Sequence, residues 1–413
     1  MKIPVTIAFL FLIAFTIQAK KIVVSDNSLA RVIASAKAGD TIWIKPGIYK
    51  TGNLLVTKSL VIIGEGLPTI DGEYKYEIFT VNVKNVTIKG LRLINTGTSS
   101  TLDYAAIKAT GADDLKVIDN ILINAYFGIH ISNTSGAQII GNKISRAQAA
   151  SETAVGNAIH LWKSNHALIE RNQVSGHRDG IYFEFVTNSV IKNNHSEKNM
   201  RYGLHFMFSN EDQYIENEFV NNGAGVAVMY SYAVNMIRNL FANNWGSSAY
   251  GLLLKDMRDS EVINNRFLNN TMGIYMEGSS RINFTKNEFS GNGYAIRMQA
   301  SCDGNVFDQN NFEANTFDIA TNGTMVLNKM EKNYWDKYEG YDLNKDGLGD
   351  TSYHPVNLYS MIVERVPVAI LLWRSFMVFL IDRAEKNLPA ITPENLLDSK
   401  PSMKPYDLLA KSN

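Results

Sequence analysis

Apolar and polar residues alternate in short stretches along the middle of the chain, and each stretch begins with glycine or alanine. The stretches are GIHIS from Gly128, AIHLW from Ala158, GIYFE from Gly180, GLHFM from Gly203, GVAVM from Gly225, GLLLK from Gly251, GIYME from Gly273 and AIRMQ from Ala295. A period of two is typical of a strand that buries one face. The lack of helical periodicity excludes leucine-rich, ankyrin and tetratricopeptide arrays.

Asparagine recurs in step with these strands. The repeated positions are Asn120, Asn142, Asn172, Asn194, Asn217, Asn239, Asn265, Asn287 and Asn310. A period of about 22 residues, with two or three short strands in each repeat, predicts an all-β solenoid. We expect a right-handed parallel β-helix from about Ile22 to about Met330. The asparagines should hydrogen-bond from coil to coil at the turns and tolerate a left-handed backbone.

Both ends of such a stack need covering, because they expose unpaired strand edges. At the front, residues 28–37 have an amphipathic helical pattern and precede a strand pair, GDTIWIKPGIY. We interpret them as an N-terminal capping helix. At the back the repeats fade after Asn322, and the chain looks helical and strongly apolar from about Tyr359 to Leu388. The expected units are therefore a β-helix at 20–330, an acidic loop region at 331–358 and a C-terminal helical, proline-containing segment at 359–413.

The first nineteen residues resemble a cleaved signal peptide. Lys2 gives a positive start, residues 3–17 are almost wholly apolar, and Ala19 is a small residue at the expected cleavage site. A membrane anchor is the alternative, but the apolar run is short. The single cysteine, Cys302, excludes an internal disulfide and is interpreted as a buried thiol. Export without disulfides fits a bacterial periplasm. The balance of 40 basic and 40 acidic residues argues against a nucleic-acid partner.

Within the alternating stretches, every second residue points away from the core and forms an outward column. One column holds His130, His160, Tyr182, His205, Ala227, Leu253, Tyr275 and Arg297; the other holds Ser132, Trp162, Glu184, Met207, Met229, Lys255, Glu277 and Gln299. Neighbouring coils lie about 4.8 Å apart, so side chains one coil apart could share a metal ion. Imidazole suits copper and thioether favours Cu(I). The candidate copper-transit face is His160, His205, Met207 and Met229, with Glu184 nearby; the alternative is that these residues have no special role.

An acid-rich loop precedes the C-terminal segment. Residues 342–350 read DLNKDGLGD, so oxygen-bearing side chains occupy loop positions 1, 3, 5 and 9, with glycine at position 6. This pattern predicts a structural calcium site formed by Asp342, Asn344, Asp346, Asp350 and the carbonyl of Leu348. Position 12 is a tyrosine in place of the usual glutamate, so Asp336 or Glu339 would have to replace the missing ligand. The alternative is an ordinary Asp/Gly-rich surface turn.

Residues 366–381, VPVAILLWRSFMVFLI, carry Arg374 as their only charge. Sixteen residues are fewer than the roughly 20 that span a bilayer. As a helix this segment would be apolar on all sides, so packing on the last coil could bury only one face of it. It could cap the stack, lie in a membrane interface or dock on a partner.

Several of these strings resemble the NosD family. They are RDGIYFEFVTNSVIKNN from Arg178, RYGLHFMFSN from Arg201, NNGAGVAVMYS from Asn221, NNWGSSAYGLLLKD from Asn243, NTFDIATNG from Asn315, NYWDKYEGYDLNKDGLGD from Asn333 and VERVPV from Val363. The resemblance covers most of the chain after residue 19. It implies a periplasmic, non-enzymatic factor that helps to assemble the copper centres of nitrous oxide reductase and handles copper transiently.

The same resemblance implies partners. An ATP-binding-cassette transporter is expected, and its permease in the inner membrane would receive residues 366–381 and the proline-containing tail at 389–405. Nitrous oxide reductase is the expected client, and a copper chaperone is a further expected partner.

A carbohydrate-active enzyme is the alternative, because lyases, epimerases and hydrolases of uronic-acid polymers use the same scaffold. Such an enzyme needs paired carboxylates, or a base beside acids. The nearest match is His177, Arg178 and Asp179, with Glu184 and Glu277 on the outward face. A passive surface-layer module is a third possibility. A bound-metal assay and a test on uronic-acid polymers separate the three.

Overall fold

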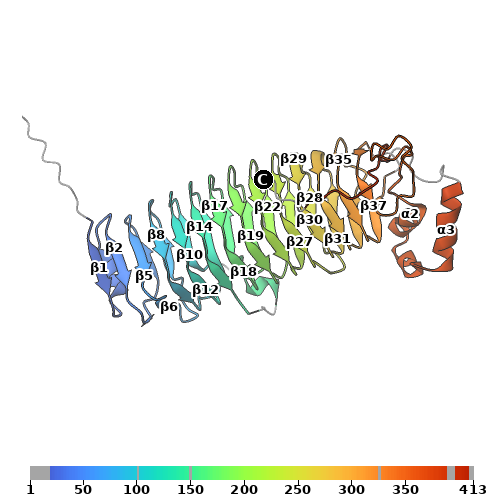
Figure 1. Cartoon of the computed structure of the whole chain (residues 1–413). Coiled ribbons are helices and arrows are strands. Elements are labelled where there is room, and N and C mark those ends of the chain that lie inside the picture. Colours follow the sequence, from blue (N-terminus) through green and yellow to red (C-terminus); the bar gives the residue numbers. More distant parts are fainter. Residues whose placement is uncertain (1–18, 100–101, 148–150, 324–326, 388–395, 409–413) are drawn as a thin grey trace, which may run out of the picture.

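Three parallel sheets run the length of an elongated stack of coils in the computed structural model, which describes residues 19–99, 102–147, 151–323, 327–387 and 396–408 (Figure 1). Within a typical coil the chain visits sheet A, then sheet B, then sheet C, and then enters sheet A of the next coil. Every pairing between neighbouring strands in these sheets is parallel; examples are β17–β20, β18–β21 and β19–β22. The expected parallel β-helix is confirmed.

Sheet A has fourteen strands: β1 (Lys21–Val24), β2 (Thr41–Ile44), β5 (Val61–Gly64), β8 (Thr87–Lys89), β11 (Lys116–Ile118), β14 (Gln138–Ile140), β17 (Leu168–Glu170), β20 (Val190–Lys192), β23 (Gln213–Ile215), β26 (Asn235–Ile237), β29 (Arg258–Ile263), β32 (Ser280–Thr285), β35 (Val306–Asp308) and β38 (Lys329–Glu331). Sheet B has thirteen: β3 (Ile48–Tyr49), β6 (Thr69–Asp71), β9 (Arg92–Ile94), β12 (Ile121–Ile123), β15 (Lys143–Ser145), β18 (Gln173–Ser175), β21 (His195–Glu197), β24 (Glu218–Val220), β27 (Leu240–Ala242), β30 (Arg266–Leu268), β33 (Glu288–Ser290), β36 (Asn311–Glu313) and β39 (Tyr334–Trp335).

Sheet C has twelve strands and contains the alternating stretches of the sequence: β4 (Leu54–Val56), β7 (Phe79–Val81), β10 (Ala105–Thr110), β13 (Phe127–Ser132), β16 (Ile159–Trp162), β19 (Asp179–Glu184), β22 (Tyr202–Met207), β25 (Ala224–Met229), β28 (Leu252–Lys255), β31 (Met272–Glu277), β34 (Tyr294–Met298) and β37 (Phe317–Thr321). The inward residues of these strands, among them Ile129, Leu161, Phe183 and Val226, are fully buried. The alternation therefore predicted the core-facing side of sheet C correctly.

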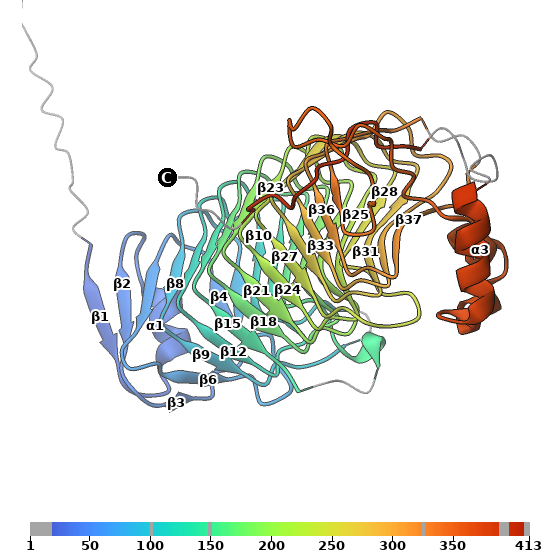
Figure 2. The same ribbon diagram turned by 45° about the vertical axis from the view of Figure 1, so that its right-hand side comes forward.

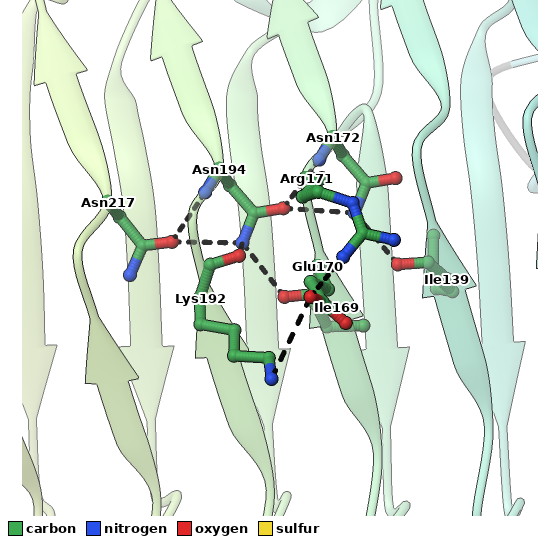
Figure 3. Close-up of polar contacts among 8 residues, drawn as sticks. All are labelled: Ile139, Ile169, Glu170, Arg171, Asn172, Lys192, Asn194 and Asn217. Carbon is green, nitrogen blue, oxygen red and sulfur yellow. Dashed lines mark hydrogen bonds and ion pairs between the residues drawn. The ribbon is translucent and has the colours of Figure 1, made fainter.

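Asparagine side chains link the coils between sheets A and B, as predicted. The backbone and side-chain N–H groups of Asn172 donate to Asn194 Oδ1 at 2.9 Å, and those of Asn194 donate to Asn217 Oδ1 at 2.9 Å (Figure 3). Asn194 Nδ2 also donates to the carbonyl of Ile169. This asparagine ladder is fully buried. One expectation is corrected: the left-handed residue is the one before each ladder asparagine, such as Asn193 at φ 56°.

A second ladder, which the sequence reading missed, links the coils between sheets B and C. It consists of Asn199, Asn222, Asn244, Asn270, Asn292 and Asn315. Each of these asparagines lies five residues after a member of the first ladder. Successive backbone N–H groups donate to the next asparagine's Oδ1, as in the first ladder. Asparagine side chains thus link the coils at two of the three corners along much of the stack.

The N-terminal end is covered as expected. Helix α1 (Leu29–Ser35) buries Leu29 and Ile33 and lies against β4. The predicted signal peptide falls almost entirely at residues 1–18, outside the described residues.

The C-terminal end is closed by the tail, which the sequence had assigned to partner docking. Asp398 accepts hydrogen bonds from the backbone and side-chain N–H groups of Asn333 at 2.9 Å and from Trp335 Nε1 at 3.2 Å. Asp398 also bridges to Met330 and Tyr353 through the backbone, and Leu396 is buried. Asp398 therefore ends the asparagine ladder, and the described part of the tail packs on its own last coil.

The apolar C-terminal segment is not one helix. After α2 (Leu358–Arg365) the chain forms a 3₁₀ helix, η2 (Pro367–Leu372), and then α3 (Phe376–Asn387). Arg374 lies between them at φ 64°, a left-handed conformation that interrupts the helix. The expectation of a continuous helix over residues 366–381 was wrong. Figures 1 and 2 both place α3 at the far end of the stack, outside the strands.

Candidate metal-binding site on sheet C

Four side chains form a continuous row across β13, β16, β19 and β22. In register, His130 pairs with His160, His160 with Tyr182, and Tyr182 with His205. Their ring centroids are 4.8, 4.7 and 4.7 Å apart. We call these four residues the histidine row. The predicted column is therefore confirmed in its order and spacing.

The histidine row differs from expectation in its exposure. His130 and His205 are buried, and both ring nitrogens of His160 are inaccessible to solvent. The cover consists of aromatic rings. Phe127 lies 5.2 Å from His130 and 5.7 Å from His160, and Tyr202 lies 4.9 Å from His205. A row that points away from the core is thus enclosed by a second layer.

Two insertions contribute to this second layer, and both lie between a sheet B strand and a sheet C strand. The first follows β15 and contains the short 3₁₀ helix η1 (Glu152–Ala154). It brings Gly156 so close to Phe127 that a Cβ atom there would lie 2.8 Å from the ring. The second follows β27 and brings the Tyr250 hydroxyl to within 3.2 Å of the Tyr202 hydroxyl. They account for the two longest steps in the asparagine period, from Asn142 to Asn172 and from Asn239 to Asn265.

Most ring nitrogens of the histidine row lack a hydrogen-bond partner among the described residues. His130 Nδ1, and both nitrogens of His160 and of His205, are buried and make no hydrogen bond to any described residue. Burial, with the neighbouring His130 and Arg178, lowers the pKa of His160 to about 3. Burial also lowers the pKa of His130. Both imidazoles are therefore neutral near pH 7, with lone pairs free to bind a metal ion.

The predicted methionines lie beside the row. Met207 and Met229 pair in register on β22 and β25, and Glu184 pairs with Met207. Both methionines are half-buried. The Tyr182 hydroxyl lies 3.7 Å from Met207 Sδ and donates to it. We call Met207 and Met229 the thioether pair. It joins the enclosed histidine row to the surface of sheet C.

Asp179 at the start of β19 is committed to a structural contact. Its carboxylate is fully buried and is held by the Arg201 guanidinium through two hydrogen bonds. Burial acts to raise the pKa of Asp179, but Arg201 outweighs it and holds that pKa below its usual range. His205 Nδ1 is 3.8 Å from the same carboxylate. Asp179 therefore positions Arg201 and cannot act as a proton donor.

The donor set fits a transiently bound soft ion better than a resident metal centre. Neutral imidazoles and thioethers are ligands that Cu(I) accepts. In the part of the chain that the structure describes, no three His, Cys, Asp or Glu side chains lie close enough to hold one ion together. The rings of the row follow one another at about one strand spacing.

The carboxylates of the predicted calcium loop accept hydrogen bonds from the loop's own backbone. Asp342 accepts from the backbone N–H groups of Asp346 and Gly347, and Asp346 accepts from that of Leu348. Asp350 accepts from Leu343. Asp336, suggested as a substitute ligand, instead accepts from the backbone of Ala314 at 2.6 Å. The calcium site with Asn344 and the Leu348 carbonyl stays a prediction.

The C-terminal helices place one face on the last coils and leave the other exposed. Val378 and Ala369 pack with Phe317 and Tyr359. In contrast, Val368, Leu371 and Phe376 are 71%, 82% and 74% exposed. Among the described residues, no helix has the length and apolar character needed to cross a membrane. The exposed apolar side of η2 and α3 is the C-terminal apolar surface.

Comparison with known proteins points to one family. A family profile described as "Periplasmic copper-binding protein (NosD)" matches residues 145–345, which include most of the histidine row and the thioether pair. Two curated relatives are both named "Probable ABC transporter binding protein NosD". The one from Stutzerimonas stutzeri is 24% identical over 89% of this chain and 87% of its own length. The one from Pseudomonas aeruginosa is 32% identical, but the match spans only 34% of this chain and 33% of that relative.

Solved structures share the scaffold. The catalytic unit of a GH87 α-1,3-glucanase from Streptomyces thermodiastaticus has a TM-score of 0.60 at 12% identity, covering 74% of this chain and 65% of its own. A GH87 α-1,3-glucanase catalytic domain bound to nigerose has a TM-score of 0.64 at 12% identity, covering 77% and 69%. At such low identity the likeness shows the fold alone.

Proposed function

We propose that this NosD-like protein is a periplasmic, non-enzymatic factor that helps to assemble the copper centres of nitrous oxide reductase. The observation that carries the proposal is the histidine row with its unpaired, buried ring nitrogens next to the thioether pair. A buried polar atom without a partner destabilises a fold, and it persists where another task requires it. Here that task is the handover of Cu(I), which is the cargo.

The chain's own residues do three things in this scheme. The thioether pair receives the ion at the half-buried edge of sheet C. His130 and His160 offer neutral nitrogens deeper inside. The rings of Phe127 and Tyr202 keep bulk water away from those nitrogens, which strengthens their interaction with a cation. Glu184 lies in register with Met207 and adds a negative charge at the entrance.

Copper loading tests this function. We would replace His160 and His205 by Phe and Met207 and Met229 by Leu, which keeps their shapes. The full chain carrying all four changes should fold and fail to support copper loading of the reductase. A double variant with His166→Phe and His195→Phe, both outside the row, is the matched control. Full copper content of the reductase with the fourfold variant would contradict the proposal.

We further propose that the transporter's permease in the inner membrane binds the C-terminal apolar surface. The relatives are named for binding to such a transporter, and this surface has no cover in the described chain. Truncation would also remove Asp398, which closes the last coil, so substitution is the cleaner test. Leu371→Ser with Phe376→Ser should abolish co-purification, whereas Leu55→Ser with Leu102→Ser, at exposed positions elsewhere, should not. Unchanged co-purification would refute the docking.

The calcium loop is proposed to stabilise the closure of the C-terminal end. The loop contacts the tail, because Gly349 donates to the carbonyl of Pro401 and Leu348 bridges to Ser402. A cation bound only to the folded state stabilises it by mass action. Chelator should therefore lower Tm in the wild type and leave Tm of an Asp342→Asn, Asp346→Asn variant unchanged. Equal melting curves with and without chelator in the wild type would exclude the site.

A hydrolase on the same scaffold is the second candidate, and the carboxylate spacing disfavours it. Glu184 and Glu277 are separated in register by Met207, Met229 and Lys255. Four strand spacings are roughly 19 Å, whereas the two catalytic carboxyl groups of glycosidases lie about 5 to 9.5 Å apart. Glu277 is also paired with Lys255 at 3.3 Å. Cleavage of a uronic-acid or α-1,3-glucan polymer by the purified chain would revive this candidate.

A further inference from the structure

Three aromatic side chains form an exposed stack at one edge of sheet C. Phe185, Phe208 and Tyr230 are the first residues after β19, β22 and β25 and are 45%, 37% and 40% exposed. Phe185 and Phe208 stack at 5.1 Å with 7° between their planes, and Phe208 and Tyr230 at 5.0 Å with 16°. We call these three residues the aromatic ladder. It spans the same coils as Tyr182, His205 and the thioether pair.

The backbone at the aromatic ladder is costly for bulky residues. Phe185, Phe208 and Tyr230 have φ of 54°, 51° and 55°, in the left-handed region. That region crowds a Cβ atom and suits glycine, asparagine and aspartate. The same turn position in other coils holds Gly111, Asn133, Lys163, Asp256 and Gly278, so none of these coils places an aromatic residue there. Folding alone therefore does not favour three exposed aromatic rings here, which points to a binding role.

The aromatic ladder borders the thioether pair. Met207 directly precedes Phe208, and Met229 directly precedes Tyr230. Because Met207 Sδ accepts a hydrogen bond from the Tyr182 hydroxyl, the same side chain also touches the histidine row. A molecule bound to the aromatic ladder would thus cover the half-buried thioethers, where a soft metal ion would enter or leave.

The geometry of the stack selects among possible occupants. The rings face one another, so the ladder presents mostly ring edges to the outside. A sugar stacks on a ring face, and those faces are largely occupied within the ladder. Ring edges carry partial positive charge and favour sulfur and carbonyl oxygen, groups that a protein surface supplies. Aromatic and methionine side chains are also enriched where proteins meet.

We propose that the aromatic ladder is the docking surface for a folded protein that exchanges Cu(I) with Met207 and Met229. The proposal rests on the function proposed above and adds the place where the client of that function, nitrous oxide reductase, binds to receive copper. The ladder holds the partner through ring-edge contacts, and the thioether pair lies under the contact. Copper then passes without release into water.

The test removes the rings without straining the fold. Asparagine suits the left-handed backbone, so the full-length triple variant Phe185→Asn, Phe208→Asn, Tyr230→Asn should fold at least as well as the wild type. The control is Tyr74→Asn, which removes a 63% exposed aromatic residue at φ 57° on another turn. The probes are purified copper-free nitrous oxide reductase and Cu(I) alone. Binding of the reductase should weaken at least tenfold in the triple variant and not in the control, with Cu(I) affinity within twofold of wild type.

Each other outcome overturns a defined part of the scheme. Equal binding of the reductase to wild type and triple variant removes the docking surface and leaves the proposed function standing. A wild type that neither binds nor loads the reductase removes both. If the triple variant instead loses binding to phosphatidylcholine vesicles or to an α-1,3-glucan oligosaccharide while the reductase still binds, the occupant is a membrane or a glycan. A tenfold loss of Cu(I) affinity would make the ladder part of the ion site and contradict a docking role.

Discussion

The asparagine ladder and the histidine row repeat once per coil, run through the same coils and use side chains of similar polarity. They differ in how their polar atoms are paired. In the ladder, Asn194 both donates to and accepts from its neighbours, and every link is close to 2.9 Å. In the row, His160 has two buried nitrogens without a hydrogen bond to any described residue.

The difference separates two uses of a repeated polar residue. A saturated ladder stabilises the fold, since a hydrogen bond in a dry interior is stronger than one in water. An unsaturated row lowers stability and keeps lone pairs available. The coil geometry that aligns asparagines for mutual bonding holds the rings of the histidine row 4.7–4.8 Å apart in T-shaped or tilted contacts, and the nitrogens of His160 stay unbonded.

Breaking the asparagine ladder should cause the largest loss of stability. Asn217→Ala removes three buried hydrogen bonds: those from the backbone and side-chain N–H groups of Asn194 to Asn217 Oδ1, and that from Asn217 Nδ2 to the carbonyl of Ile191. At about 1–3 kcal/mol for each unpaired buried group, the free energy of unfolding should fall by about 5 kcal/mol. Asn283→Ala, at an exposed strand position, is the control. The denaturant midpoint measures both, and a loss below about 1 kcal/mol would mean that the ladder adds little.

Acid should destabilise the protein through the histidine row. The pKa of His160 is about 3 in the folded protein against 6.5 for the free side chain. Between these two pH values His160 is protonated in the unfolded chain and neutral in the folded protein. The stability is therefore present above pH 6.5 and is lost as the pH falls toward 3, by on the order of 4 kcal/mol at the limit. His160→Phe should remove this part of the acid sensitivity, measured as urea midpoints at pH 7.5 and pH 4. Parallel pH profiles of variant and wild type would contradict it.

A buried carboxyl group gives stability the opposite dependence on pH. Burial raises the pKa of Asp212 to about 8, and its Oδ2 has no partner among the described residues. The unfolded chain releases this proton near pH 4, so stability falls as the pH rises from about 4 to 8 and is constant above. The corresponding residue of a later coil, Asn305, accepts from Ile282 and donates to the carbonyl of Ser279.

Asp212→Asn should therefore turn an unsaturated position into a saturated one. Its Oδ1 can still accept from Ser189, and no buried proton is needed. We expect a gain of about 3 kcal/mol at pH 8 and a smaller one at pH 5, read from the shift of the denaturant midpoint. An equal gain at both pH values would show that the carboxyl group does not titrate in this range.

The smallest effect on stability is expected at neutral pH for a substitution within the histidine row. His160→Phe replaces two unpaired nitrogens by carbon in an aromatic setting between His130 and Tyr182. Stability at pH 7.5 should rise by about 1 kcal/mol while the affinity for Cu(I) falls. A destabilised variant with unchanged Cu(I) binding would show that the nitrogens serve the fold and not the ion.

The repeat pattern was enough to predict the coil, the inward residues of sheet C and the order of both outward columns. These depend on local alternation and on one period. The enclosure of the histidine row depends on two insertions that fold back over sheet C. Only their lengths were visible, as the long steps that end at Asn172 and at Asn265. The second asparagine ladder had a clear signal that went unused: a constant spacing of five residues, as from Asn194 to Asn199.

The repeat pattern could not predict the long-range contacts that close the C-terminal end of the stack. Asp398 meets Asn333 across 65 residues, and no periodicity links an aspartate in the tail to a ladder of asparagines. The break at Arg374 was also missed, because the apolar composition of residues 366–381 hides a single left-handed residue. The calcium site stays a prediction, and the way its carboxylates accept from backbone N–H groups depends on geometry that residue spacing does not carry.

Asp398 also sets the order in which the molecule becomes complete. Each ladder asparagine accepts from one side and donates to the other, so the last asparagine of an unfinished stack is a template that any further asparagine could extend. The side chain of Asp398 accepts but has no N–H to pass on, so the ladder ends at this residue. It leaves the ribosome after every coil has been made. Until this residue docks, the last coil has an open edge that a second chain could join, and once it has docked that edge is covered.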